Sequence, residues 1–245
     1  MKPRFDWHLT SGIAGISNSL VLLAVLLSFP LVLHFSGVTE ISPQGPQHTQ
    51  AILRFCFVVS AFLWVCFIIA LVGIRRRGTT TVRELVGARW NGWQLPLFDI
   101  GIGCATLLVM AIVGNVSNVL LGRFQSDSAV FRSMVAQNKV EAIAFLAAAL
   151  TAGFVEEFVF RGYVQRQGRA LLGSTLAASA LQVIIFTQGH FYQGILRLVP
   201  VLLIGVLLTA VALWRKSLIP GMIAHGLGDG LVAFLFFAKH LYPKS

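Results

Sequence analysis

The stretch AIAFLAAALTAGFVEEFVFR, residues 142–161, decides the fold class of this chain. It is mostly apolar as far as Val155, and two adjacent carboxylates, Glu156 and Glu157, follow directly. About 20 mostly apolar residues are enough for a helix to cross a bilayer. The stretch therefore predicts a membrane-spanning helix that carries acidic side chains.

The composition of the whole chain supports a membrane protein. Of its 245 residues, 56% are hydrophobic and only 11% are charged, whereas soluble domains carry about 25% charged residues. So few charges cannot cover a surface that faces water. The same figures exclude a disordered chain, a collagen-like repeat, a coiled coil and a disulfide scaffold. We predict an all-α integral membrane protein.

Apolar runs predict about seven transmembrane helices, at residues 13–33, 55–74, 97–121, 140–161, 176–190, 198–214 and 219–237. The first run follows Lys2 and Arg4 and lacks a clear cleavage site, so we expect a retained helix rather than a signal peptide. Cys56, Cys66 and Cys104 lie in these runs without the spacing of a metal site. We expect them to be packed core residues.

The charge balance predicts the orientation and the surroundings. The chain has 19 Lys and Arg against 9 Asp and Glu, which in a soluble protein would indicate nucleic acid. Here the basic residues mostly flank apolar runs, and a cytoplasmic N-terminus places more of them inside, as the positive-inside rule favours. We expect a multi-pass protein of the plasma (inner) membrane that contacts lipid and not nucleic acid.

The acidic pair in the fourth run needs an explanation. Glu157 and Arg161 are four residues apart and can pair on a helix. Glu156 points about 100° away and has no evident local partner. One interpretation is a solvated helix end. The other is a carboxylate held in a cavity of low dielectric, where it acts as a base.

Two further segments place ionisable residues in apolar runs. His190 ends the fifth run, in the pattern Phe-x-x-x-His, and His225 and Asp229 lie four apart in the seventh. A lone histidine in a span is more often a packed residue. Ionisable residues inside membrane spans are nevertheless functional candidates, because their burial needs compensation. We predict one polar site on the fourth, fifth and seventh helices.

Together, Glu-Glu-x-x-x-Arg, Phe-x-x-x-His and His-x-x-x-Asp resemble the motifs of the CPBP family of intramembrane proteases. That family includes the type II CAAX prenyl endopeptidases and the Abi-like proteins. The resemblance covers roughly residues 140–237. It implies a catalytic core in residues 134–245, preceded by a three-span region, residues 1–133, that has no readable motif.

The resemblance implies a role for each residue of the first two motifs. Glu156 matches the catalytic glutamate, which activates a water molecule together with His190. Glu157 and Arg161 match the supporting acid and base. Peptide hydrolysis needs such a base within hydrogen-bond reach of the water.

In the third motif, His225 and Asp229 match the pair that stabilises the oxyanion. The family usually has Asn where this chain has Asp229. An ionised carboxylate cannot donate a hydrogen bond. Asp229 would therefore be either protonated in an apolar setting or used to orient His225.

The resemblance implies an endopeptidase that acts on a peptide or lipidated protein, with CAAX-type processing of C-termini as one form. It favours catalysis without a cofactor. A zinc enzyme with Glu156, His190 and His225 as ligands is an alternative, although the chain has no His-Glu-x-x-His pattern. A non-catalytic immunity or scaffold protein and a proton-coupled transporter are further alternatives, and we find no inverted repeat that supports the transporter.

The depth of the site in the membrane is open. Glu156 and His190 lie at equal sequence distances from Gly173, so a helical hairpin turning there would bring them level. His225 lies much closer to the polar residues Arg215 and Lys216. A flat bundle would not bring all three level, whereas a tilted, broken or extended fifth helix would.

Overall fold

A computed structural model describes residues 12–39, 46–87, 94–122 and 135–241, with side chains as far as residue 231. Helices form nearly all of the described chain, which contains no strand. Lys2 and Arg4, which precede the first predicted helix, lie outside the described residues. The elements are α1 (Ile16–Ser36), α2 (Pro46–Arg77), α3 (Val82–Val86), α4 (Gln94–Leu121), α6 (Lys139–Glu156), the π-helix η1 (Glu157–Val164), α7 (Gln165–Leu172), α8 (Thr175–Gln188), the 3-10 turns η2 (Phe191–Gln193) and η3 (Ile195–Arg197), α9 (Leu198–Arg215) and α10 (Ile219–Leu241).

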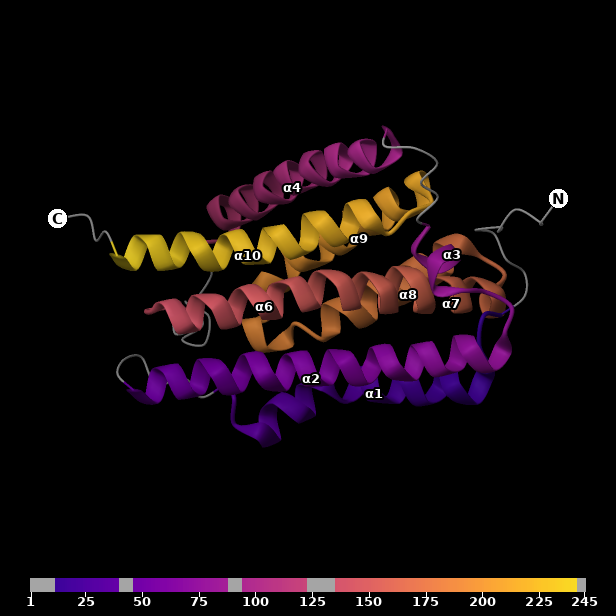
Figure 1. Cartoon of the computed structure of the whole chain (residues 1–245), viewed down its shortest axis with the longest axis horizontal. Coiled ribbons are helices and arrows are strands. Elements are labelled where there is room, and N and C mark those ends of the chain that lie inside the picture. Colours follow the sequence, from indigo (N-terminus) through magenta and orange to yellow (C-terminus); the bar gives the residue numbers. More distant parts are fainter. Residues whose placement is uncertain (1–11, 40–45, 88–93, 123–134, 242–245) are drawn as a thin grey trace.

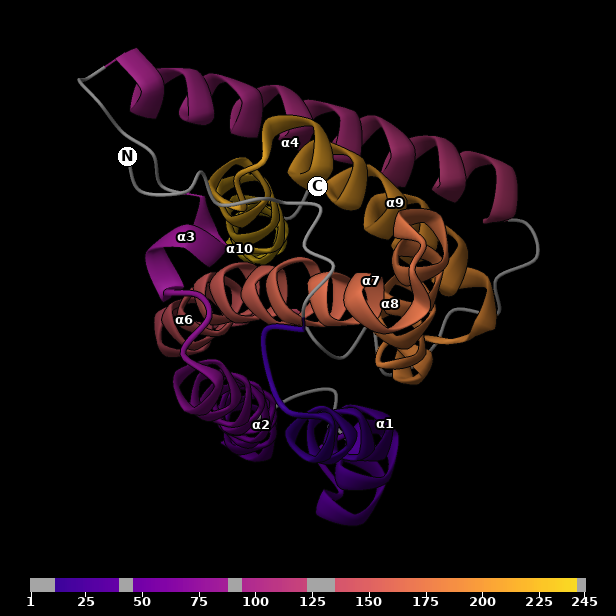
Figure 2. The same cartoon turned by 90° about the vertical axis from the view of Figure 1, so that its right-hand side faces the viewer.

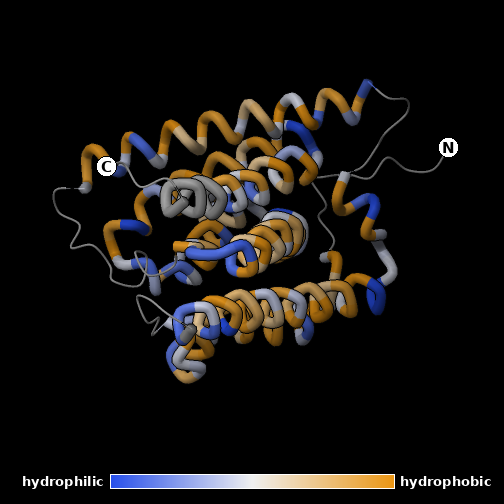
Figure 3. The backbone as a smooth tube through the Cα atoms, turned by 60° about the vertical axis from the view of Figure 1, so that its left-hand side comes forward, coloured by the Kyte–Doolittle hydropathy of each residue, from blue (hydrophilic) through white to orange (hydrophobic). Residues whose placement is uncertain are grey.

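The all-α membrane fold is confirmed. Five helical stretches of the described residues are long and apolar enough to cross a membrane: Ile16–Ser36, Gln47–Arg77, Gln94–Leu121, Lys139–Leu172 and Ile195–Arg215. Apolar residues also cover much of the outer surface, and hydrophobic colour runs along most helices in Figure 3. The protein is an integral membrane protein.

The count of seven spans is not confirmed. The run expected at residues 176–190 forms α8, which has only 14 residues. At about 1.5 Å per residue it is about 21 Å long, short of the roughly 30 Å of a bilayer core. The chain leaves the helix at Gly189 and continues through two 3-10 turns before α9. Helix α10 begins at Ile219 as expected, although its side chains are described only to Leu231.

Helix α6 lies in the middle of the molecule. It packs against α2 on one side and against α10 on the other, and α4 lies beyond α10 (Figures 1 and 2). Helix α1 runs beside α2 at the opposite edge. The central position of α6 places its acidic pair where several helices can surround it.

The largest hydrophobic core joins the N-terminal helices to the segment that carries the motifs. Leu26 of α1 and Leu63 of α2 pack in one cluster with Phe158 of η1 and Phe186 of α8. Cys56 and Cys66 are buried as expected, but Cys104 is exposed, because it faces outward from α4. The division at residue 133 stays a prediction.

Two glycines fix how α6 and α10 meet. A Cβ atom on Gly153 of α6 would lie only 2.5 Å from the Cα atom of Gly226 on α10. Farther along the same contact, a Cβ atom on Gly162 of η1 would lie 3.0 Å from Cδ1 of Leu218, the residue that precedes α10. Helix α10 therefore starts level with η1, and α7 extends beyond it towards Gly173. This offset brings His225 to the depth of Glu156.

Candidate active site

The acidic pair lies inside a continuous helix rather than at its end. Helix α6 widens at Glu157 into the eight-residue π-helix η1 and continues through α7, so that the whole stretch Lys139–Leu172 has 34 residues. Short π-helical segments occur frequently at functional sites. Every residue from Glu157 to Tyr163 is buried. The interpretation of Glu156 and Glu157 as a solvated helix end is therefore wrong.

Glu157 joins three helices through one buried carboxylate. Its Oε1 atom accepts a hydrogen bond from Nη1 of Arg161 at 3.0 Å and lies 3.1 Å from Nδ1 of His225. Arg161 also donates from Nη2 to the carbonyl oxygen of Gly205, at 3.1 Å, and its guanidinium carbon lies 4.4 Å from the ring centre of Phe186. The predicted Glu157–Arg161 pair thus holds α10 and α9 against η1.

Glu156 points in a different direction and has a different environment. Its side chain is 12% exposed, and its Oε2 atom lies 3.8 Å from Nε2 of His225. That oxygen is buried and has no hydrogen-bond partner among the described residues. A buried carboxylate oxygen without a hydrogen bond is costly, so this atom is available to a ligand.

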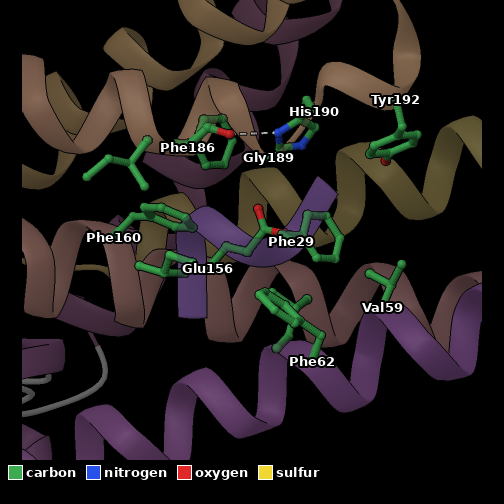
Figure 4. Close-up of a pocket in the computed structure, with 12 residues that line it drawn as sticks. Phe29, Val59, Phe62, Glu156, Phe160, Phe186, Gly189, His190 and Tyr192 are labelled. Carbon is green, nitrogen blue, oxygen red and sulfur yellow. Dashed lines mark hydrogen bonds between the residues drawn. The ribbon is translucent and has the colours of Figure 1, made fainter. Parts of the chain in front are cut away.

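His190 lines the same pocket as Glu156 (Figure 4). Its Nδ1 atom lies 2.9 Å from the carbonyl oxygen of Phe186, one helical turn earlier. A carbonyl only accepts, so Nδ1 carries the proton, and Nε2 of a neutral ring keeps a free lone pair. The Phe186 ring lies 4.8 Å from the imidazole, centre to centre. The hairpin at Gly173 therefore brings Glu156 and His190 together, as their spacing predicts.

The pocket between these residues has a volume of about 50 Å³. A water molecule needs about 10–15 Å³ of such space, so the pocket has room for a few. Its residues are Leu26, Phe29, Val59, Phe62, Leu63, Glu156, Phe160, Ile185, Phe186, Gly189, His190 and Tyr192. The site therefore combines a small polar centre with an apolar wall.

Asp229 occupies the open side of the site. Its Oδ2 atom lies 3.5 Å from Nε2 of His225, which confirms that the two share one face of α10. The Asp229 side chain is 52% exposed. The carboxylate is thus not enclosed in an apolar setting, and it lies beside the nitrogen that also faces Glu156.

A comparison with protein families identifies the motif-bearing segment. Residues 138–231 match the family described as type II CAAX prenyl endopeptidase Rce1-like. This segment thus resembles that CAAX protease family. No curated protein and no solved structure matched the chain.

The matched segment contains all seven named residues of the three motifs but only part of the pocket. Leu26 and Phe29 come from α1, and Val59, Phe62 and Leu63 from α2. Sequence reasoning missed this wall, because apolar residues in an apolar helix give no signal of what they contact. Figure 4 shows Phe29 and Phe62 beside Glu156.

Tyr192 is the other residue that sequence reasoning missed, although it lies only two positions after His190. Its ring stacks against the His190 ring at 6.3 Å, and its hydroxyl accepts a hydrogen bond from Gln193 at 3.1 Å. Desolvation in the pocket raises the pKa of Tyr192 to about 12. Tyr192 therefore stays protonated beside the site at any ordinary pH.

A second buried polar cluster lies at the start of α6. The Oε1 atom of Glu141 lies 3.2 Å from Nδ1 of His48 and accepts hydrogen bonds from Thr49 at 2.5 Å and Asn138 at 2.7 Å. At about 1.5 Å per residue, Glu141 is about 22 Å from Glu156, so this cluster ties α2 to α6 away from the site. Among the described residues, no group of three or more His, Cys, Asp or Glu side chains is placed to hold a metal ion.

Proposed function

We propose that this protein is a CAAX-type intramembrane endopeptidase in which Glu156 and His190 activate a water molecule. The observation that carries the proposal is the buried Oε2 atom of Glu156, which has no hydrogen-bond partner among the described residues, beside a pocket that Glu156 shares with His190. Water inside a bilayer needs a cavity lined by protein. The similarity of residues 138–231 to the CAAX protease family supports a protease.

In the proposed reaction, Glu156 takes a proton from the water while the water oxygen bonds to the substrate carbonyl carbon. His190 orients this water through its free Nε2 atom, because Nδ1 is held by the Phe186 carbonyl. The tetrahedral intermediate then collapses as the carbon–nitrogen bond breaks. The proton on Glu156 moves to the leaving amine, and the carboxylate is restored.

His225 is the proposed oxyanion donor. Its Nδ1 atom faces Glu157 at 3.1 Å, and its Nε2 atom faces Asp229 at 3.5 Å and Glu156 at 3.8 Å. Carboxylates on both sides favour a ring with protons on both nitrogens, and only that form donates from each. An N–H group aimed at the developing oxyanion stabilises the transition state.

Asp229 is a positioning residue in this scheme. An ionised Asp229 cannot donate a hydrogen bond to the oxyanion, but it stands next to the His225 nitrogen that does. It favours the proton on that nitrogen and restrains the ring. Of the two roles that the sequence leaves open, its exposed position supports this one.

The proposed substrate is a peptide with a prenylated cysteine near its C-terminus. The test uses the purified chain in liposomes with a farnesylated CAAX peptide and the same peptide without the farnesyl group. Mass spectrometry should detect release of the three C-terminal residues, faster from the farnesylated peptide. Cleavage of both peptides at equal rates would leave a protease without prenyl selectivity, and cleavage of neither would contradict the proposed function.

A further inference from the structure

The first turn of α1 is attached to the helix that carries the acidic pair. The hydroxyl group of Tyr163, in η1, lies 3.1 Å from Nδ2 of Asn18 and 3.1 Å from Oγ of Ser19. Asn18 also donates a hydrogen bond to the carbonyl oxygen of Ile69 on α2, at 3.1 Å. A single tyrosine hydroxyl therefore connects η1 to α1 directly and to α2 through Asn18.

The chemistry of the groups fixes the direction of these hydrogen bonds. Ser19 donates its one hydroxyl proton to the carbonyl oxygen of Gly15, at 3.0 Å, so its Oγ atom accepts the proton of Tyr163. The amide nitrogen of Asn18 only donates, so the Tyr163 oxygen accepts from it. Tyr163 is 1% exposed. Its hydroxyl thus uses both its proton and a lone pair within the protein, and a phenylalanine ring could do neither.

A second attachment lies four residues later in the same continuous helix. The Oε1 atom of Gln167, in α7, accepts hydrogen bonds from the backbone N–H groups of Ile13 at 2.9 Å and Ala14 at 3.2 Å. Its Nε2 atom donates to the carbonyl oxygen of Ala14 at 3.0 Å. Gln167 and Tyr163 therefore hold one stretch of helix against the residues that precede and begin α1.

The attached stretch is continuous with the residue that would act as the base. Glu156 ends α6, and Tyr163 follows seven residues later without a break in the helix. Tyr163 and Val159 pack in one buried cluster with Leu22 of α1, whereas Glu156 lines the pocket. A shift or rotation of the helix at Tyr163 therefore also moves Glu156.

We propose that Asn18 and Ser19 are positioning residues, which hold η1 through Tyr163 in the orientation that places Glu156 in one pocket with His190. This inference rests on the proposed function. Asn18 and Ser19 lie outside the matched segment at residues 138–231. The start of α1, which carries no readable motif, thus sets the geometry of a reaction whose chemistry comes from α6, α8 and α10.

The test measures kcat and KM per folded enzyme in liposomes, on the farnesylated peptide. Tyr163→Phe keeps the ring in the core but removes the hydroxyl. We expect kcat to fall by about 10- to 100-fold, the larger value being the loss for a displacement of 1 Å. KM should stay close to that of wild type, because Tyr163 does not line the pocket. A tyrosine that only stabilises the fold would leave kcat per folded enzyme unchanged.

Two other changes act on the same hydroxyl from α1 and α2. Asn18→Ala removes its donor. In Gly73→Ala, the new methyl group would collide with the Asn18 amide and displace it. Both variants should lower kcat as Tyr163→Phe does. Combining either one with Tyr163→Phe should cause little further loss, because changes that remove one shared interaction are not additive.

The matched controls are Ser17→Ala, at an exposed serine two residues before Ser19, and Asn115→Ala on α4, whose amide bonds the Ala111 carbonyl of its own helix. Both should keep the wild-type kcat. Ser19→Ala carries the test if Tyr163→Phe does not fold. A wild-type kcat in every folded variant of the attachment, or fully additive losses in the double variants, would overturn the inference. A wild type that cleaves no peptide would instead contradict the proposed function.

Discussion

The Nδ1 atom of His225 lies 3.1 Å from the Oε1 atom of Glu157, the oxygen that also accepts a hydrogen bond from Arg161. The Glu157 side chain is 0% exposed, so this atom links α10 to η1 in a buried setting. Glu157 therefore has a structural task that its neighbour Glu156 does not share.

We predict that Glu157→Gln destabilises the protein and lowers its activity. The change leaves Arg161 buried without its anionic partner, and removing one member of a buried pair costs about 3–5 kcal/mol. Denaturant unfolding in micelles measures the free energy of unfolding. Glu156→Gln is the matched control, because it makes the same substitution one residue away and should leave stability close to that of wild type. Equal stability of Glu157→Gln and wild type would contradict the structural role of Glu157.

The contact between Gly153 and Gly226 gives a second prediction. A methyl group at Gly153 meets the backbone of α10, so Gly153→Ala should push that helix away and move His225. A displacement of 1 Å can cost about 100-fold in rate, and overpacking costs about 1–3 kcal/mol. The control is Gly114→Ala on α4, where nothing lies within 4 Å of the new carbon. It should change neither the cleavage rate nor the free energy of unfolding by much. Wild-type cleavage by Gly153→Ala would show that the approach of the helices does not set the site.

Much of the site could be predicted because its residues follow helical spacing. Glu157 meets Arg161, and His225 meets Asp229, since residues four apart share a helix face. The depth of His225 could not be predicted, because it depends on the glycine contact between two distant helices. It also could not be predicted which of Phe29 and Phe35 lines the pocket, because both lie on one apolar helix. Only packing against α2 and α8 decides that Phe29 lines the pocket while Phe35 is exposed.

For Asp229, we predict that Asp229→Asn keeps substantial activity and that Asp229→Ala loses about 100-fold or more, the scale of a lost oxyanion donor. Asn can still restrain the His225 ring or donate a hydrogen bond itself, whereas Ala can do neither. Initial rates of peptide cleavage measure both variants. If Asn is as inactive as Ala, the carboxylate itself is essential and a neutral amide cannot replace it.

The pH profile should separate the two ways in which Asn keeps activity. The titratable groups beside His225 are Glu156, Glu157 and Asp229, and Arg161 pairs with Glu157. Removing the Asp229 charge makes the doubly protonated His225 ring less favourable. Activity of Asp229→Asn should therefore fall at a lower pH than wild-type activity on the alkaline side. An unchanged alkaline limb would show that Asp229 does not act through the His225 proton.

Catalysis without a metal gives a further prediction. EDTA or 1,10-phenanthroline should leave cleavage largely intact, and elemental analysis should find well below one zinc ion per chain. Loss of activity together with stoichiometric zinc, and its return when zinc is added, would contradict this prediction. Glu156, His190 and His225 would then be metal ligands.

The most direct test is the cleavage rate of Glu156→Gln in liposomes, compared with wild type on the farnesylated peptide. Glutamine keeps the size of the side chain but cannot take a proton from water, and a general base supplies about 10²–10⁴-fold in rate. We predict a loss of at least that size, with unfolding behaviour like that of wild type. Full cleavage by a folded Glu156→Gln variant would contradict the role of Glu156 as the base.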